Sequence, residues 1–517
     1  ERHCAYYAAR LQGWAEDAKG PRQKEAWAEI DMEINDARAA WAWAVAQSNC
    51  ACINQAIEGL AGYHLCRGLT QQGETMCHMA LERLEAMESI DLAEESVLAQ
   101  ARVMQWHSNF LPPEQALVSA KRSLALLESP TLAMQDVSRG KAAALQQIAF
   151  AIASFDRAAA VLCCEQSLAL SRACGDVWRE GQALLGLGMQ HYEMGSYNAA
   201  RYNLEESLAI LRRLNDQTCI AQALQMLSFV AWSLGDCNEC VRLAMEVLAL
   251  RRETGDLQEI ADALWGLTLP YIFYLGWFDE AWALLEELQS LSRDLPDLYN
   301  AVAHGLKAWT KMYAGHYQEA RIEGQIAVEQ FRQLKDWPGA WTKQRHLIVA
   351  YGVLGHIALA LKQYAEAASL IETSVAGFRS LQRPQDVSIA LCLLSYTLWA
   401  QNRIAEAGMH LTEALRMGIE TGDHIALTYG LVGMALILVS HKDCERAIEL
   451  IAAVSANFPL LEASPWFWDV AVRHIDAAMA TLSQDVVAAA RERGQARELR
   501  ETAAEMLAEL AAMARTV

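Results

Sequence analysis

A short turn motif recurs about every 40 residues along most of this chain of 517 residues. The motif is a turn, then an aromatic or small apolar residue, and three residues later a small residue, usually Ala. Successive copies are spaced by 40, 41, 39, 47, 40 and 40 residues. A fixed period of this size is typical of solenoids, in which each unit packs mainly against its neighbours. The seven clear copies carry at the first apolar position Tyr197, Cys237, Phe278, Tyr317, Tyr364, Ile404 and Cys444.

Weaker copies at Thr70, Pro113 and Arg157 bring the expected number of units to about ten. Only 10 prolines occur and runs of β-branched residues are scarce, which favours helix nearly everywhere. A Gly or Asn in the left-handed conformation ends a helix, and an Asp side chain caps the amides that begin the next. Such pairs separate neighbouring units at Gly175-Asp176, Asn215-Asp216, Gly255-Asp256 and Gly422-Asp423. Each unit is therefore predicted to be a helix hairpin.

Small residues recur at two further positions of the unit. One follows a Leu ten residues before the motif, as in Leu187-Gly188, Leu227-Ser228, Leu354-Gly355 and Leu394-Ser395. The other lies seven residues after the motif Ala, at Ser207, Ala327, Ser374 and Ala414. This pattern resembles the tetratricopeptide repeat. The resemblance implies an all-α, right-handed superhelical solenoid of about ten helix hairpins, with repeats near 40 residues where that family has about 34.

One unit is longer than the others. From Asp336 to Tyr364 is 28 residues, against 21 from Asp176 to Tyr197, and seven extra residues are two helical turns. We therefore predict a helix that begins at Trp337-Pro338 and runs about two turns beyond its counterparts. That helix is expected to project three side chains from the edge of the array: Lys343, Arg345 and His346.

Two other helices have unusual sequences. Pro270 falls inside the first helix of its unit and should kink it, because proline removes a backbone hydrogen bond. The stretch from His424 to His441 is uncharged and apolar between its two histidines, and is nearly long enough to span a membrane. Repeat signals flank this stretch on both sides, so we interpret it as a buried repeat helix.

Composition excludes several kinds of partner. With 43 basic against 63 acidic residues, the surface should repel nucleic acids and anionic membranes. The 13 scattered cysteines indicate reduced thiols and a cytoplasmic protein. Glu1 is not followed by the apolar stretch of a signal peptide, and the chain is expected to be part of a larger protein.

Motifs of catalysis and metal binding are weak. Cys237 and Cys240 have the spacing of a redox or zinc pair, but they occupy packing positions of the repeat, so we expect no metal there. His64 and Cys66 with Cys77 and His78 do not share helical faces and are a poor ligand set. We find no phosphate-binding loop, nucleophile elbow or zinc-protease motif. The sequence therefore predicts neither an enzyme nor a bound cofactor.

The two ends suggest a second resemblance. Five stretches resemble segments that flank the repeats of bacterial signal-transduction ATPases, the STAND class, which has LuxR- and SARP-type transcriptional regulators among its relatives. They run from Arg2 to Tyr7 and from Glu33 to Ala44 at one end, and from Glu449 to Ala453, Trp466 to Trp468 and Glu498 to Thr502 at the other. Asp36 stands where that family has Asn. The resemblance implies a linker at 1–48, repeats at 49–457 and capping helices at 458–517. It also implies a nucleotide-binding core and an output domain in the parent protein.

In tetratricopeptide arrays the first helix of each unit lines a concave groove. Transferring those positions by resemblance gives as candidate ligand-binding residues Gln182, Tyr192, Gln222, Gln225, Trp232, Trp265, His304, Lys311, His356, Tyr396 and Trp399, with Met189, Phe229 and Asp262 beside them. Aromatic and amide side chains suit a ligand groove, although aromatics at helical spacing also form cores. The expected function is a sensor that binds a peptide, a protein or a small effector. The alternative is a free-standing adaptor without a switching role.

Overall fold

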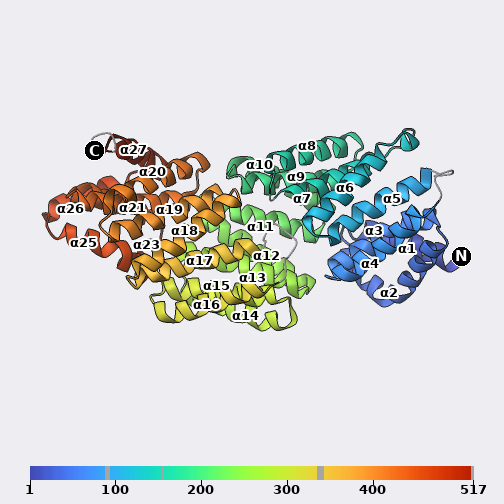
Figure 1. Cartoon of the computed structure of the whole chain (residues 1–517), viewed down its shortest axis with the longest axis horizontal. Helices are drawn as coiled ribbons and strands as arrows, with labels where there is room; N and C mark the ends of the chain where they lie inside the picture. The colour runs from blue at the N-terminus through green and yellow to red at the C-terminus, as the bar shows by residue number, and fades with distance from the viewer. Residues whose placement is uncertain (88–93, 154, 335–342, 514–517) are drawn as a thin grey trace. The chain divides into compact units, whose positions relative to one another are not determined.

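The computed structural model describes residues 1–87, 94–153, 155–334 and 343–513, with side chains described as far as residue 510. Every regular element in these ranges is helical (Figure 1). The chain forms two compact units, described separately below. Unit 1 holds residues 1–191 and 198–226, and unit 2 holds 192–197 and the described residues from 227 onward. The boundary therefore falls within the helices α9 to α11.

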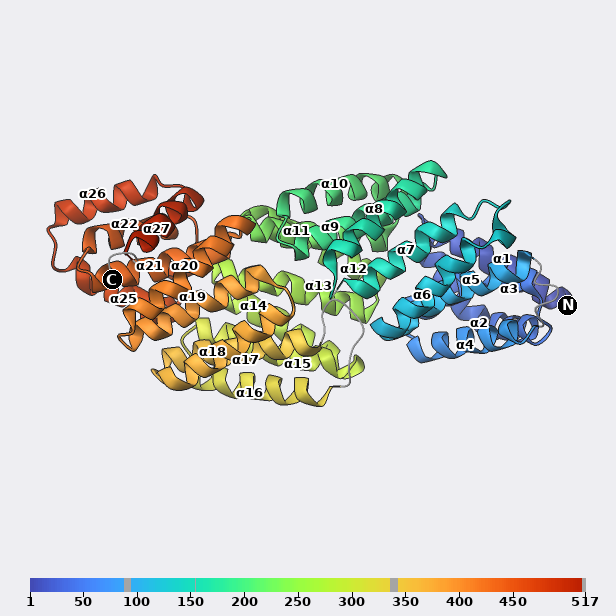
Figure 2. The same cartoon turned by 45° about the horizontal axis from the view of Figure 1, so that its top comes forward.

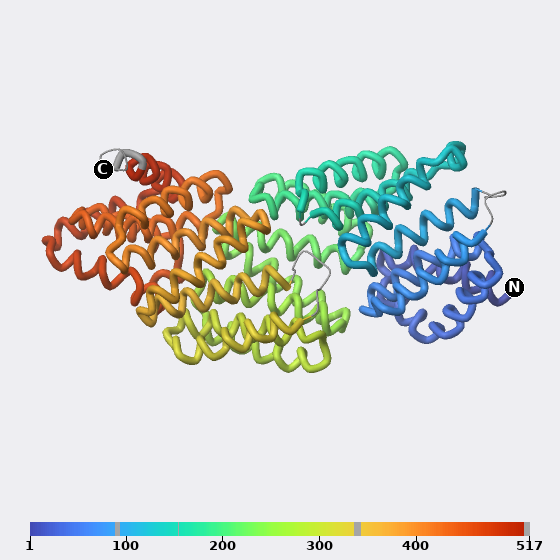
Figure 3. Tube along the Cα trace, viewed as in Figure 1, coloured from blue at the N-terminus to red at the C-terminus, as the bar shows by residue number. Residues whose placement is uncertain are grey.

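The helices pair as ten hairpins, as the repeat predicts, and successive hairpins can be followed along the tube in Figure 3. The hairpins are α3 (Cys50–Cys66) with α4 (Thr70–Glu85), α5 (Glu94–His107) with α6 (Pro113–Leu127), α7 (Ser138–Ile152) with α8 (Arg157–Ala173), α9 (Val177–Glu193) with α10 (Tyr197–Leu214), α11 (Gln217–Ser233) with α12 (Cys237–Thr254), α13 (Leu257–Pro270) with α14 (Phe278–Leu291), α15 (Asp297–Tyr313) with α16 (Tyr317–Gln333), α17 (Lys343–Ala360) with α18 (Tyr364–Ser380), α19 (Pro384–Ala400) with α20 (Ile404–Thr421), and α21 (His424–Ser440) with α22 (Cys444–Ser455). All ten motif positions are the first residue of a second helix. This confirms the all-α repeat fold.

The predicted stop and start residues act as expected. Gly175, Asn215, Gly255 and Gly422 all have positive φ, which ends the preceding helix. Each following Asp accepts a hydrogen bond from the backbone N–H three residues on, as from Ala426 to Asp423 at 2.8 Å. The chain therefore reverses where the sequence predicts.

Small residues let paired helices approach closely. A Cβ atom at Gly188 would lie 2.5 Å from the Leu204 side chain, and one at Gly355 would lie 2.7 Å from that of Ile371. Buried serines also join the two helices of a hairpin. Ser374 donates to the Ile348 carbonyl at 2.8 Å, an arrangement repeated at Ser123, Ser167 and Ser207.

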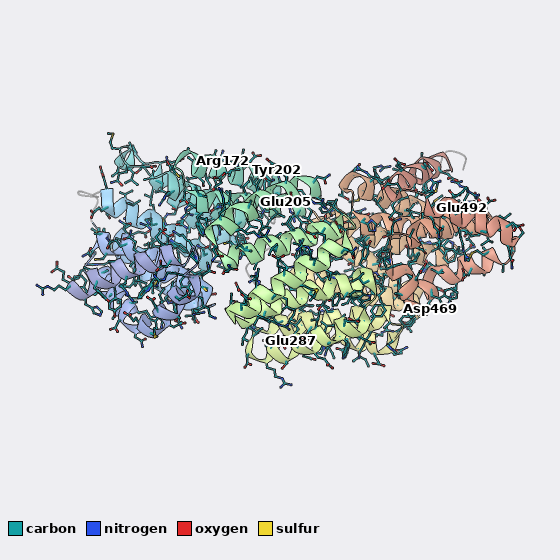
Figure 4. All side chains as sticks on the ribbon, turned by 180° about the vertical axis from the view of Figure 1, so that it is seen from behind. Arg172, Tyr202, Glu205, Glu287, Asp469 and Glu492 are labelled. Atoms are coloured by element: carbon teal, nitrogen blue, oxygen red, sulfur yellow. The ribbon has the colours of Figure 1, made fainter. Side chains whose placement is uncertain are left out.

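Charged side chains gather on the second helices. Figure 4 labels Arg172 on α8, Tyr202 and Glu205 on α10, and Glu287 on α14. Arg172 donates to Glu180 at 2.8 Å, and Arg252 on α12 pairs with Glu287 at 2.7 Å.

The kink predicted at Pro270 stays a prediction, whereas the burial predicted for α21 is confirmed. At Pro270 the α-helical bonding of α13 ends and a π-helical turn, Tyr271–Leu275, follows, which accommodates the missing N–H. Helix α21 is buried over nearly its whole length, as predicted. None of the helices in the described ranges is long and apolar enough to cross a membrane.

For the longer unit, the predicted direction of two side chains was wrong. Arg345 and His346 do not project from an edge; they are 8% and 7% exposed and face inward. The described helix α17 has 18 residues, like its counterparts, and the predicted start at Trp337-Pro338 lies outside the described residues. The seven extra residues had suggested a helix end beyond the array, but Arg345 and His346 are buried.

The ends of the chain are helical as well. At the N-terminus, α1 (Arg2–Asp17) and α2 (Gln23–Ala46) pack on α3 within unit 1. In unit 2, α26 (Gln484–Gln495) packs on α22, and α27 (Leu499–Met513) packs on α20 and α21. Short helical segments lead to them: α23 (Leu460–Ala463), α24 (Pro465–Phe467), a π-helical turn at Trp468–Val472 and α25 (Arg473–Met479).

Unit 2 closes on itself. Figure 2 shows hairpins α15/α16, α17/α18 and α19/α20 side by side, in agreement with their contacts. Tyr197 donates to Asp423 at 2.8 Å across 226 positions, and the Tyr313 and Tyr429 hydroxyls meet at 2.5 Å. The first helices of the hairpins in unit 2 therefore surround an interior space.

Candidate functional site: a cavity among the first helices of unit 2

A cavity of about 250 Å³, which we call the inner cavity, lies within unit 2. Its lining comes mainly from first helices of successive hairpins, α11, α13, α15, α17 and α19, with Tyr192 from the end of α9, three residues from α21 and its cap, and a few residues of the second helices α16 and α18. Because each hairpin presents the same face inward, the stack builds one shared enclosure.

Aromatic rings form one wall of the inner cavity. Tyr192 contacts Phe229 at a ring-centroid distance of 6.2 Å, and Trp232 contacts Phe273 at 6.0 Å. Phe273 in turn packs edge-on against Trp309 at 4.9 Å, and Trp309 lies 4.6 Å from His356. Such tilted and edge-to-face contacts stabilise aromatic clusters and leave flat apolar faces toward the space.

Charged groups meet at one end of the cavity, where α17 and α19 begin. Arg383 is buried and pairs with both Glu193 and Asp386, the latter at 2.6 Å. Arg345 lies 4.0 Å from the same two carboxylates, and burial lowers its pKa. Two guanidinium groups are thus paired with two carboxylates. A third carboxylate, Asp423, also lines the cavity and accepts from the Tyr197 hydroxyl and the Ala426 amide.

Two histidines face the cavity in neutral form. Burial lowers the pKa of His346 to about 3, with a smaller effect of the neighbouring Arg345 charge. Burial lowers the pKa of His356 to about 4. The ring of His346 lies between Trp265 and Phe331, at 5.3 Å from each.

Some buried polar atoms of the lining have no hydrogen-bond partner among the residues that the structure describes. They are both amide atoms of Gln385, Nε2 of His356 and Nε1 of Trp232. Gln385 is 5% exposed and His356 is 3% exposed. Unpaired buried polar atoms are rare in folded proteins and cost about 1–3 kcal/mol each.

The structure places four of the predicted site residues in the inner cavity: Tyr192, Trp232, Trp265 and His356. Phe229, noted beside them, lines it too. Four of the eleven predicted site residues therefore lie around one space in unit 2, and the other seven do not.

The predicted glutamines lie in unit 1. Gln182 donates to the Cys219 sulfur at 2.8 Å, Gln222 is exposed, and Gln225 is half-buried. Three others form surface ion pairs or packing contacts of unit 2. His304 bonds Glu323 at 2.6 Å, Lys311 lies 3.1 Å from Glu319, and Trp399 donates to Ser440 at 2.8 Å.

Two further residues are part of the packed interior. The Tyr396 hydroxyl donates to the Tyr429 carbonyl at 2.5 Å and is buried. Asp262 accepts from Tyr299 at 2.9 Å, and burial raises its pKa to about 6.

Sequence reasoning missed the polar end of the cavity. The transferred positions lie from the second turn of each first helix to its end, whereas Arg345, Arg383, Gln385 and Asp386 stand at helix starts. A signal was present, since these residues open two helices that are otherwise almost wholly apolar. Phe273 was also missed, because it lies in the π-helical turn that follows Pro270. Trp309 was missed although it lies on α15 between the predicted His304 and Lys311.

The two cysteine candidates pack as repeat residues. Cys237 and Cys240 are buried in the first turn of α12, where Cys240 lies 3.4 Å from the Ser228 hydroxyl. Burial raises the pKa of both thiols, that of Cys240 to about 11. In the other set, His64 and Cys77 are buried while Cys66 and His78 are exposed.

Fold and cavity together define a class: a tetratricopeptide-like stack of helix hairpins with a ligand-sized interior. No model of a known protein family matches the chain, and no curated protein does. Solved structures are similar at low identity. Aspartyl phosphate phosphatase F from Bacillus subtilis aligns at 10% identity and TM-score 0.44, over 71% of this chain and 92% of its own.

Two other structures show the same kind of resemblance. A Rap protein complexed with competence and sporulation factor aligns at 11% identity and TM-score 0.40, over 86% of this chain and 99% of that one. A STAND protein with a tetratricopeptide repeat sensor from Pyrococcus horikoshii aligns at 13% identity and TM-score 0.29, over 80% of this chain and 55% of that one. Such likeness concerns fold alone.

Proposed function

We propose that this chain is a sensor that binds a small molecule in the inner cavity. The observation that supports the proposal is a 250 Å³ cavity with aromatic walls and buried polar atoms of Gln385 and His356 that lack partners among the described residues. Apolar walls with a few placed polar groups are the usual make-up of a ligand site. A ligand that pairs those atoms removes their desolvation cost.

The size of the cavity favours a small effector over a protein partner. An apolar cavity of about 150 Å³ holds benzene, so 250 Å³ suits a somewhat larger molecule. A stable protein interface instead covers about 800 Å² on each partner. The cavity is partly open, and its volume suits a small effector or a single peptide side chain better than a whole protein surface.

We also propose that binding is passed to a nucleotide-binding core and an output domain in a parent protein, as the resemblance of the ends implies. The charged groups around Arg383 join α9 to α19 beside the cavity, so a ligand that favours one spacing of these helices would shift their equilibrium. The upstream coding sequence tests this role: a sensor is continuous with such a core, and an adaptor is not.

Binding itself is tested with indole as a probe. A Cβ atom at Gly305, in the cavity wall, would have no neighbour nearer than 4.0 Å, so Gly305→Leu fills the space without a clash at that atom. We expect calorimetry to detect indole binding to the wild type and at least tenfold weaker binding to Gly305→Leu. Gly13→Leu is the matched control, because Gly13 lies on α1 with nothing within 4 Å. Absent binding, or equal binding to Gly305→Leu, would refute the proposal.

A further inference from the structure

We infer that the inner cavity takes an uncharged, elongated aromatic molecule with a hydroxyl or N–H donor at one end and a carboxamide-like group at the other. This inference rests on the proposed function and names its ligand class. Four features carry it: the distance between the polar groups, the flat walls between them, the unpaired atoms of His356 and Gln385, and the pairing of the charged groups with one another.

The polar groups stand at opposite ends of the lining. Arg345 and His356 both line the cavity from α17, eleven residues apart, which is about 16 Å along a helix. Gln385 belongs with the Arg345 end, because its neighbour Asp386 lies 4.0 Å from Arg345. A ligand that reaches both Gln385 and His356 must therefore be long.

The walls between the two ends favour flat rings. Trp232, Phe273 and Trp309 succeed one another along one side, with centroid distances of 6.0 and 4.9 Å. Aromatic faces gain most from offset or edge-on contact with other aromatic rings. A ligand made of linked rings would continue this series of contacts across the cavity.

His356 requires a donor from the ligand. Its Nδ1 lies 2.8 Å from the Gly352 carbonyl oxygen, which can only accept, so Nδ1 carries the hydrogen. Nε2 is then a lone-pair acceptor, and burial keeps the ring neutral by lowering its pKa to about 4. A phenolic hydroxyl or an N–H group satisfies this atom, whereas a second acceptor would not.

Gln385 requires both a donor and an acceptor. Its side-chain amide offers an N–H donor and a carbonyl oxygen, and neither is paired among the described residues. A carboxamide matches both at once. A carboxylate would lack the donor and would approach Asp386 and Glu193, while a cation would approach Arg345 and Arg383. Because Arg383 is paired with Glu193 and Asp386, and Asp423 accepts from Tyr197 and Ala426, an uncharged ligand leaves these contacts undisturbed.

A set of rigid probes tests the class. The first is biphenyl with a para hydroxyl on one ring and a para carboxamide on the other. The second replaces the carboxamide with a carboxylic acid, and the third lacks the hydroxyl. By calorimetry near pH 7.5 we expect the first probe to bind at least tenfold more tightly than either of the others, as a missing or mismatched buried hydrogen bond predicts.

Two variants assign the contacts. His356→Phe should abolish the tenfold advantage of the hydroxyl, and Gln385→Leu should abolish the preference for carboxamide over acid. The controls are the exposed His441→Phe and Gln71→Leu, which should change neither ratio. Circular dichroism checks folding, and the wild-type ratios stand without any variant.

The outcomes separate the two proposals. If the acid binds as tightly as the carboxamide, or the hydroxyl gives no advantage, the ligand class is wrong. If indole binds but no biphenyl does, the elongated class is overturned while ligand binding stands. If neither indole nor any biphenyl binds, both proposals fall.

Discussion

His356 is held in one tautomer by its own helix. Its Nδ1 donates to Gly352 one turn earlier, while Trp309 and Trp466 pack on the ring at 4.6 and 5.3 Å. The surrounding rings exclude water, so the charged imidazolium is disfavoured. The same burial that makes Nε2 a fixed acceptor also makes the residue sensitive to acid.

Replacing His356 with Phe should change the acid stability of unit 2. Burial lowers the folded pKa to about 4, below the unfolded value of about 6.5. Above pH 6.5 the ring is neutral in both states, and the folded state keeps its full stability. As the pH falls toward 4, only the unfolded state gains the proton, so the folded state loses stability. The difference in unfolding free energy, wild type minus His356→Phe, should fall by about 3 kcal/mol across that window.

Chemical denaturation at several pH values measures this difference. Ordinary carboxylates affect wild type and variant alike, so they cancel. Asp423 works in the opposite direction, since burial raises its pKa to about 6, but it is present in both proteins. The exposed His441→Phe should show no such slope, and a flat difference for His356→Phe would contradict the burial argument.

Glycines show how one residue type serves two needs in a helix. At Gly355 an added Cβ would lie 2.7 Å from Ile371, so close packing of α17 on α18 excludes it. At Gly305 the nearest atoms are 4.0 Å away, so the glycine lines open space. Only the first position is required by the hairpin.

Alanine at these two positions should therefore have opposite effects. Gly305→Ala should stabilise unit 2 by about 0.5–1 kcal/mol, because alanine lowers the conformational entropy of the unfolded chain. Gly355→Ala should destabilise it by about 1 kcal/mol or more, because overpacking outweighs that gain. Urea unfolding measures both. Equal shifts would mean that helix propensity alone decides and that the close approach is unimportant.

The helices could be predicted because their signals are local. Motif residues such as Tyr197 begin helices, and caps such as Asp423 bond an amide three residues away. The cavity could be predicted only in part. Trp232 and Trp265 follow from their place in the repeat, whereas Gln385 lines the cavity because α19 lies near α9. That proximity depends on the rotation summed over several hairpins, which no short segment encodes.

At the scale of the molecule, the segment after α22 packs inside unit 2. Trp466 and Phe467 are fully buried, and Trp466 donates to the His356 carbonyl at 3.1 Å across 110 positions. The nearby Ser464 donates to the Tyr313 carbonyl at 2.8 Å. The wall of the inner cavity is thus supported from behind by residues from the far end of the chain.

Trp466→Ala should loosen helices remote in sequence. Removing a buried tryptophan costs about 3–5 kcal/mol, and its contacts lie on α15 and α17. We expect faster amide hydrogen exchange around Tyr313 and His356, together with a lower melting temperature. Trp468→Ala is the control, because Trp468 is two residues away and about half exposed. Faster exchange confined to residues after 457 would show that the segment does not support the cavity.

The closure of unit 2 should depend on the buried ion pairs of Arg383. This side chain is 3% exposed and joins Asp386 to Glu193, which is 190 positions away at the end of α9. Breaking a buried pair leaves a charge without compensation, so Arg383→Met should destabilise unit 2 by about 3 kcal/mol or more. Adding Glu193→Gln removes one of the stranded carboxylates and should restore part of that loss.

Arg403→Met is the surface comparison for the Arg383→Met and Glu193→Gln variants. Arg403 bonds Glu406 at 2.6 and 2.7 Å with similar chemistry, but on the surface of α20, where such pairs contribute about 0–1 kcal/mol. Denaturant unfolding should therefore separate the two arginine variants clearly, and hydrogen exchange should rise at the end of α9 only for Arg383→Met. If the two variants lose equal stability, and Glu193→Gln restores nothing, the contact between α9 and α19 is not held by these charges. The interior would then be closed by aromatic packing alone.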